Sequence, residues 1–160
     1  MPNEPKPRPA TAPGLDLDGF VPYRLSVLSN RVSGAIARHY SEEFGLTIPE
    51  WRVMAVLGGT SELAAREVAN RTAMDKVQVS RAVAGLMRAG RVARGGDAHD
   101  GRVTRLSLTP QGRAIYDRIV PLALHLEELF LSALSAEERR VFDRLMTKLA
   151  RQARLLGPDA

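Results

Sequence analysis

The sequence predicts a mainly α-helical protein with one small β-hairpin, and three observations support this fold class. Hydrophobic residues make up 44% of the chain but aromatic residues only 5%, a balance that favours helices over an all-β fold. Apolar residues recur at helical spacing in several segments. A glycine-rich loop, residues 95–101, is flanked by two short segments that are typical of strands. The chain of 160 residues is the size of one domain.

The N-terminal part is predicted to be a tail followed by a packing helix. Residues 1–18 are expected to be a flexible tail, because prolines among polar residues cannot bury apolar surface. A tail without a role of its own is favoured over an arm that binds a partner. Residues 19–46 are expected to hold an N-terminal dimerization helix, from Phe20 to about Glu43. Its narrow apolar stripe consists of Leu25, Leu28, Val32, Ala35 and His39.

Residues 47–110 are predicted to form a lobe that begins with a short helix. Thr47 and Glu50 form a capping box, in which each residue satisfies a backbone N–H of the other. This pattern predicts a helix over residues 48–57, and the two glycines that follow are expected to end it.

Two further short helices are predicted in this lobe, joined by a tight turn. The first is expected to begin near Ser61 or Glu62 and to run to residue 70. Either Thr72 or Asp75 can cap the second, which is expected to continue to Ala89. Two short helices with a tight turn between them are typical of a helix-turn-helix.

A β-hairpin is predicted after the second of these helices. Arg91–Arg94 and Val103–Leu108 read as short strands around the glycine-rich loop. Such a hairpin beside a helix-turn-helix is a wing. The predicted architecture is therefore a winged helix-turn-helix with helices on both sides of it.

Residues 111–156 are expected to be C-terminal dimerization helices. Thr109 as N-cap and Pro110 at the first position begin a long helix. Its heptad positions are Ile115, Leu122 and Leu129, and Ile119, Leu126 and Ala133. A capping box of Ser135 and Glu138 begins the last helix, whose apolar face holds Val141, Phe142, Leu145 and Leu149. Since a small lobe leaves such stripes little to pack against, a homodimer is predicted.

The helix near residues 76–88 has one face suited to the major groove of double-stranded DNA. A helical projection places Val79, Val83, Leu86 and Met87 toward the core. The opposite arc holds Val77, Gln78, Arg81, Ala84, Gly85 and Arg88. Arg81 is suited to guanine, Gln78 to adenine and Val77 to a thymine methyl group. Lys76 and Arg88, nearer the helix ends, are suited to phosphates.

The wing is predicted to bind DNA through Arg102. The negative potential of the minor groove favours insertion of this arginine. Asp100, two residues earlier, is expected to support Arg102 by fixing the orientation of its guanidinium. His99 is interpreted as a plain loop residue.

The charge of the chain is concentrated in this region. Residues 66–105 hold nine basic and four acidic side chains, a surplus equal to the net charge of +5 of the whole chain. A local basic surplus favours an anionic partner such as nucleic acid.

Several functional classes are not expected. The chain has no cysteine, which excludes disulfides and thiolate zinc sites. No metal site is expected, because His39, His99 and His125 are scattered. No catalytic motif indicates an enzyme and no cofactor is expected. No apolar run approaches the length of a membrane span, so a cytoplasmic protein without a membrane partner is predicted.

Over residues 20–155 the sequence resembles the MarR family of bacterial regulators. The resemblance is carried by Ser61-Glu62-Leu63-Ala64, Asp75-Lys76-Val77-Gln78-Val79-Ser80-Arg81, Asp100-Gly101-Arg102 and Leu106-Ser107-Leu108-Thr109-Pro110-Gln111-Gly112. It implies a triangular homodimer whose two winged lobes bind a near-palindromic operator. It also implies that Ser80 belongs to the DNA-binding set, that Arg102 is the wing-tip arginine and that Asp100 is its partner.

The same resemblance implies control by a small molecule. Many members are repressors released by aromatic or other organic anions that bind between the dimerization helices and the lobe. Tyr23, Arg24, Trp51 and Arg52 are the candidate effector-binding residues, and their surroundings are similar to members that sense aromatic acids or their coenzyme A thioesters. Alternatively, Trp51 is a core residue and the arginines form ion pairs. The alternative function is a winged-helix protein-interaction module without specific DNA binding.

Overall fold

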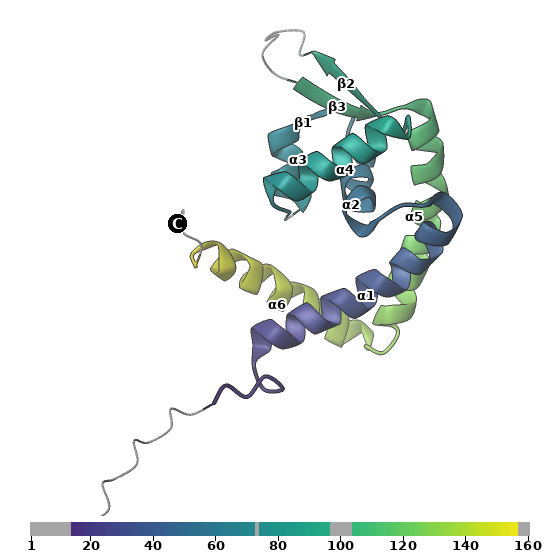
Figure 1. The fold of residues 1–160 in the computed structure, drawn as a ribbon. Helices are drawn as coiled ribbons and strands as arrows, with labels where there is room; N and C mark the ends of the chain where they lie inside the picture. Colours follow the sequence, from purple (N-terminus) through teal and green to yellow (C-terminus); the bar gives the residue numbers. More distant parts are fainter. Residues whose placement is uncertain (1–13, 73, 97–103, 157–160) are drawn as a thin grey trace, which may run out of the picture.

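A computed structural model describes residues 14–72, 74–96 and 104–156. Figure 1 shows a winged lobe joined by one long helix to the remaining two helices. The lobe and helices consist of α1 (Val21–Phe44), α2 (Ile48–Gly58), β1 (Leu63–Ala64), α3 (Ala65–Thr72), α4 (Lys76–Arg88), β2 (Val92–Gly96), β3 (Thr104–Leu108), α5 (Pro110–Leu131) and α6 (Ala136–Arg154). The fold is therefore mainly α with a small β-wing, as predicted.

Side-chain caps set the beginnings of four helices. The Thr47 hydroxyl accepts a hydrogen bond from the Glu50 N–H, and Thr47 N–H donates to the Glu50 carboxylate at 2.9 Å. Asp75, rather than Thr72, caps α4 by accepting from the Gln78 N–H at 2.8 Å. At the start of α6, the Ser135 N–H donates to the Glu138 carboxylate at 2.8 Å. Hydrogen bonding by the Ser135 backbone and side chain lowers the pKa of Glu138. These polar groups satisfy N–H groups that a helix leaves unpaired at its first turn.

The sheet has three antiparallel strands in the order β1-β3-β2. β1 was missed by the sequence patterns, and the predicted helix start at Ser61 or Glu62 is wrong. Leu63 pairs with Leu106 of β3, and both side chains are buried in the core. The helix begins only afterwards, at Ala65, because Leu63 and Ala64 use their backbone in the sheet.

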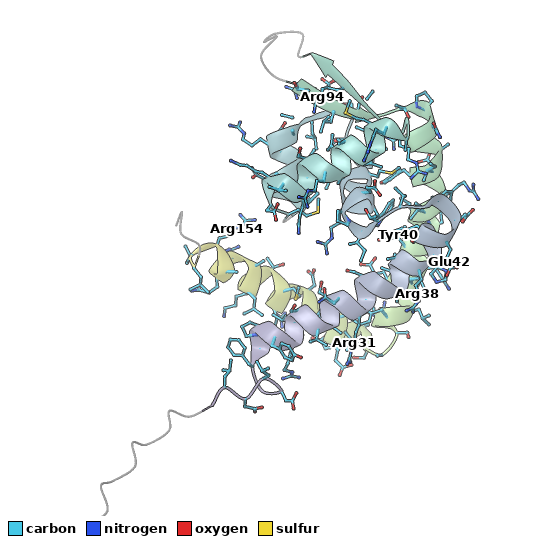
Figure 2. The ribbon with its side chains drawn as sticks, in the orientation of Figure 1. Arg31, Arg38, Tyr40, Glu42, Arg94 and Arg154 are labelled. Carbon is cyan, nitrogen blue, oxygen red and sulfur yellow. The ribbon has the colours of Figure 1, made fainter. Side chains whose placement is uncertain are left out.

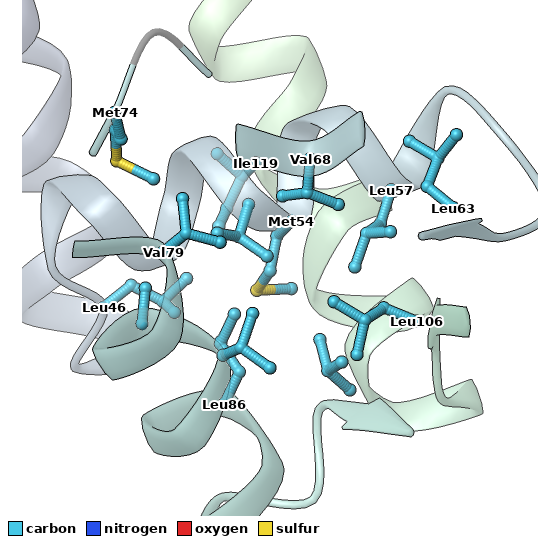
Figure 3. Packing of buried hydrophobic residues seen from close by; sticks show 14 of the residues in the cluster. Leu46, Met54, Leu57, Leu63, Val68, Met74, Val79, Leu86, Leu106 and Ile119 are labelled. Atoms are coloured by element: carbon cyan, nitrogen blue, oxygen red, sulfur yellow. The ribbon is translucent and has the colours of Figure 1, made fainter. Parts of the chain in front are cut away.

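The hydrophobic core lies within the lobe and fixes the orientation of α4. Figure 3 shows side chains from several elements packed together; those that are fully buried include Leu46, Met54, Leu57, Val68, Leu86, Leu106 and Ile119. Burial of a large aliphatic side chain stabilises the fold by about 1.5–3 kcal/mol. Because α2, α3, α4, β3 and α5 all contribute, the lobe holds α4 on a rigid base.

The beginning of α5 is tied to the end of α4. The Thr109 hydroxyl accepts from the Gly112 N–H at 3.0 Å and donates to the Gly90 carbonyl at 2.7 Å. Gly90, just after α4, has φ 68° and ends this segment in the left-handed conformation that glycine adopts without strain. Gly112 lies so close to the Arg91 carbonyl that a Cβ atom would be 2.0 Å from its oxygen. These contacts fix the beginning of α5 to the segment that follows α4.

Two predictions about apolar stripes need correction. In α5, Ile115 and Ile119 pack on the core of their own lobe rather than on a second chain, since α5 passes directly beside the lobe. In α1, His39 is exposed, while the neighbouring Tyr40 is buried against Trp51. Only the later part of the α5 stripe stays open, with Leu129 61% exposed.

The side of the molecule formed by α1, α5 and α6 carries an unpartnered apolar surface. No residue of α6 is buried. A groove of about 620 Å³ lies between the three helices, with Val32 and Phe130 among its walls. The large exposed apolar residues of α1, α5 and α6 are Val21, Tyr23, Leu25, Leu28, Leu124, Leu129, Phe130, Phe142, Leu145, Met146 and Leu149.

In the described ranges, a bilayer-spanning length of apolar residues is found in no single helix. Taken together, α5 and α6 have the length and apolar composition of a membrane span, but a bend of 108° lies between them.

Candidate nucleic-acid interface

The inner face of α4 anchors this helix in the lobe. Val79, Ala82, Val83 and Leu86 are buried, and Gly85 lies against the Glu50 side chain of α2. Two details differ from the helical projection. Met87 is exposed rather than buried, and Gly85 is half-buried rather than open, because α2 crosses α4 at this glycine.

The outer face of α4 presents the predicted DNA-binding side chains to solvent. All of those that lie in the described ranges are exposed: Lys76, Val77, Gln78, Ser80, Arg81 and Arg88. Val77 is 57% exposed, which is costly for an apolar side chain in water but suits contact with a thymine methyl group. No described residue forms an ion pair with Lys76, Arg81 or Arg88. Their charges are therefore available to an anionic ligand.

The wing lies beside α4, since Arg94 of β2 borders the same hollow as Lys76 and Ser80 of α4. β2 and β3 pair from Val92 opposite Leu108 to Gly96 opposite Thr104. Arg102, its predicted support Asp100, and His99 lie outside the described residues. The strand pairing nevertheless continues up to both ends of the hairpin loop.

Beside Lys76, the structure gathers two cations that the sequence patterns did not assign to the site, Arg66 and Arg94. Arg66 of α3, Lys76 of α4 and Arg94 of β2 border one hollow of about 340 Å³ beside α4. Figure 2 shows Arg94 on the β2 strand of the wing. The basic surplus of residues 66–105 indicated such a surface, but only the fold shows which arginines share it.

The four predicted effector-binding residues do not come together within one chain. Trp51 lies between two tyrosines: its ring is tilted against Tyr40 of α1, with centroids 5.7 Å apart, and stacked on Tyr116 of α5, with centroids 6.0 Å apart. Tyr23 lies about 25 Å from Tyr40 along α1, at 1.5 Å per residue. Trp51 thus bridges three helices, far from the exposed Tyr23 and Arg24.

The charge of Arg52 acts on this aromatic group. Burial raises the pKa of the Tyr40 phenol, and the nearby Arg52 partly opposes that shift. Arg52 is half-buried and belongs to no ion pair among the described residues. An aromatic group with an unpaired cation is chemically suited to an aromatic anion. Over residues 14–72, 74–96 and 104–156, no three acidic or histidine side chains converge as a metal site would require.

The three-stranded sheet with its β2–β3 wing, the helix-turn-helix packed on the core, and an α4 whose exposed cations have no ion pair among the described residues define a winged helix-turn-helix DNA-binding protein. Comparison with known proteins gives the family. The sequence model of the MarR family matches residues 44–103. The chain is 30% identical to the HTH-type transcriptional repressor Rv2887 of Mycobacterium tuberculosis over 132 residues, which covers 82% of this chain and 91% of the relative.

Solved structures agree with the sequence relatives. A MarR family transcriptional regulator from Silicibacter pomeroyi is 31% identical with a TM-score of 0.72, over 85% of this chain and 99% of that one. The PcaV transcriptional regulator from Streptomyces coelicolor, solved with its natural ligand, is 26% identical with a TM-score of 0.74, over 89% and 99%. This chain belongs to the MarR family of transcriptional regulators.

Proposed function

We propose that the protein is a sequence-specific transcriptional repressor that inserts α4 into the major groove of its operator. The observation that carries this proposal is the division of α4 into a buried inner face and an outer face of exposed Gln78, Arg81 and Val77. A major groove about 12 Å wide admits a helix. Arg81 is then the guanine reader, Gln78 the adenine reader, and Ser80 a further contact.

Repression is supported by the relative named as a transcriptional repressor at 30% identity. A repressor of this size acts by occupying DNA, which needs only tight, selective binding. Arg102 would insert into the minor groove next to the groove that α4 fills, with Asp100 holding its guanidinium.

We propose a homodimer as the DNA-binding form. The exposed apolar side chains of α1, α5 and α6 form a surface that a second copy would bury. A twofold dimer places two copies of α4 on successive turns of one face of DNA, about 34 Å apart, and therefore binds a near-palindrome.

We propose that a small organic anion, such as an aromatic acid or its coenzyme A thioester, releases the DNA. Support comes from Trp51 and Arg52 beside the α1–α5 junction, and from PcaV, which was solved with its natural ligand. Tyr23 and Arg24 can belong to this site only if a second copy supplies them, because they lie about 25 Å away within one chain.

The test begins with selection of genomic fragments by the purified protein, followed by fluorescence anisotropy at several salt concentrations. Scrambled DNA of equal length is the competitor. We expect preferred binding to the selected fragment by a factor of about 10³ or more, with a steep salt dependence. Equal weak binding to both DNAs would support the protein-interaction alternative instead.

Binding of the effector can be measured separately from binding of DNA. Trp51 is the only tryptophan of the chain, so ligand binding beside it changes the intrinsic fluorescence. Aromatic acids that alter this fluorescence are expected to release the selected DNA at the same concentrations. Quenching without release would contradict an effector role for that site.

A further inference from the structure

We propose that Arg66, Lys76 and Arg94 together form a binding site for the phosphates of the DNA backbone on one flank of α4. This inference rests on the proposed insertion of α4 into DNA. It assigns two residues, Arg66 and Arg94, that the patterns in the sequence did not connect with DNA binding.

The first argument is the convergence of the three cations. They come from α3, α4 and β2, which are separate segments of the chain, and they border the same hollow of about 340 Å³. All three side chains are exposed. Like charges on one surface repel one another, and an anion bound between them replaces that repulsion with attraction.

The second argument is that these charges are not neutralised by the protein. Some arginines elsewhere form ion pairs with acidic side chains: Arg118 with Glu43, Arg139 with Glu128, and Arg140 with Glu137. Among the residues that the structure describes, Arg66, Lys76 and Arg94 have no acidic partner. The surface is therefore open to an external anion.

The third argument is the position and shape of the hollow. A helix with side chains is about 10–12 Å wide and the major groove about 12 Å, so the flanks of an inserted helix meet the two sugar-phosphate strands. Ala65 and Ala69 of α3 line the hollow between the cations. Such small side chains allow a sugar-phosphate strand to approach closely, while Ser80 and Asn70 at the border can donate hydrogen bonds to phosphate oxygens.

The opposite flank of α4 is different. There the groove is bordered by Arg81 and Arg88 but also by the carboxylate of Glu50, which caps α2. The acidic group weakens the attraction of that flank for phosphate. The two backbones of the groove are therefore bound unequally, with the stronger electrostatic contact on the side of α3 and β2.

The test compares wild-type protein with the double variant Arg66→Gln/Arg94→Gln by anisotropy over a series of salt concentrations. Both the selected DNA and the scrambled DNA are used as probes. Two lost contacts per protomer make four in a dimer, so the slope of log affinity against log salt becomes shallower by about 3 to 4. Affinity falls by about tenfold or more at about 0.1 M salt, by the same factor on both DNAs.

The control is Arg38→Gln, which removes one positive charge, against two in the double variant, from an exposed position of α1 away from the lobe. It is expected to leave the slope unchanged. If wild-type protein shows a steep slope and the double variant keeps it, the phosphate site is wrong while the proposed function stands. A loss limited to the selected DNA would mean base reading, which also contradicts the site. Absence of DNA binding by wild-type protein would overturn both proposals.

Discussion

At the scale of single residues, two glycines in helices have opposite requirements. Gly112 is buried where α5 meets the Arg91 carbonyl, and a Cβ atom would be 2.0 Å from that oxygen. At Gly34 in α1 no atom lies within 4 Å of the Cβ position. The first glycine is needed for close approach, and the second is not.

We expect Gly112→Ala to lower the free energy of unfolding by about 1–3 kcal/mol, because a backbone carbonyl cannot move aside as a side chain can. Gly34→Ala is the matched control in the same secondary structure. It is expected to raise the free energy of unfolding by up to about 1 kcal/mol through helix propensity. Urea denaturation of both variants measures the difference. Equal effects would show that α5 does not press on Arg91.

The outer residues of α4 were predictable from sequence, but their exact neighbours were not. A projection at 100° per residue gave the right surface for Val77, Gln78 and Arg81. It misplaced Met87 and Gly85, because a projection contains no information about where α2 crosses α4. The wing residues Asp100 and Arg102 stay predictions.

At the scale of elements, the start of α5 links the wing to the rest of the molecule. Thr109 uses one hydroxyl both to cap α5 and to bind the Gly90 carbonyl at the end of the α4 segment. One side chain therefore fixes the beginning of α5 to the end of the α4 segment.

Thr109→Ala is expected to lower the free energy of unfolding by about 1–2 kcal/mol, the usual cost of losing an N-cap. Thr109→Ser keeps the hydroxyl and is the control, with most of the stability retained. Thermal unfolding followed by circular dichroism provides the measurement. A serine variant as unstable as the alanine variant would show that the methyl group, not the hydroxyl, matters.

The capping residues make the beginnings of the helices predictable from sequence. The strand β1 is not predictable in this way, because it depends on a partner strand far away in the chain. Thr47, Thr109 and Ser135 are local signals, and each begins a helix in the structure. β1 has only two residues, and its existence depends on pairing with β3 about forty residues later. A local sequence pattern contains no information about such a distant partner. The pattern of this segment therefore predicts the start of a helix instead of a strand.

At the scale of the whole molecule, the apolar surface on α6 supports the proposed homodimer. Leu149 is 51% exposed and lies with Leu145 and Met146 on one face of that helix. Thr147 is also exposed and lies on the opposite face of α6.

We expect Leu149→Glu to weaken dimerization by tenfold or more, because it places a charge in an apolar interface. Thr147→Glu adds the same charge on the other face and is expected to leave the dimer intact. Sedimentation equilibrium over a range of concentrations measures both. A Leu149→Glu protein that dimerizes like wild type would exclude this face of α6 from the interface.

Reading of base edges by α4 is tested by the ratio of affinities for selected and scrambled DNA, measured for wild type and for Arg81→Ala. Each bidentate contact to guanine provides about 1–3 kcal/mol of discrimination. Arg81→Ala is expected to lower this ratio by about 10-fold or more, while binding to scrambled DNA changes much less. An unchanged ratio, with intact folding, would contradict base reading by the exposed face of α4.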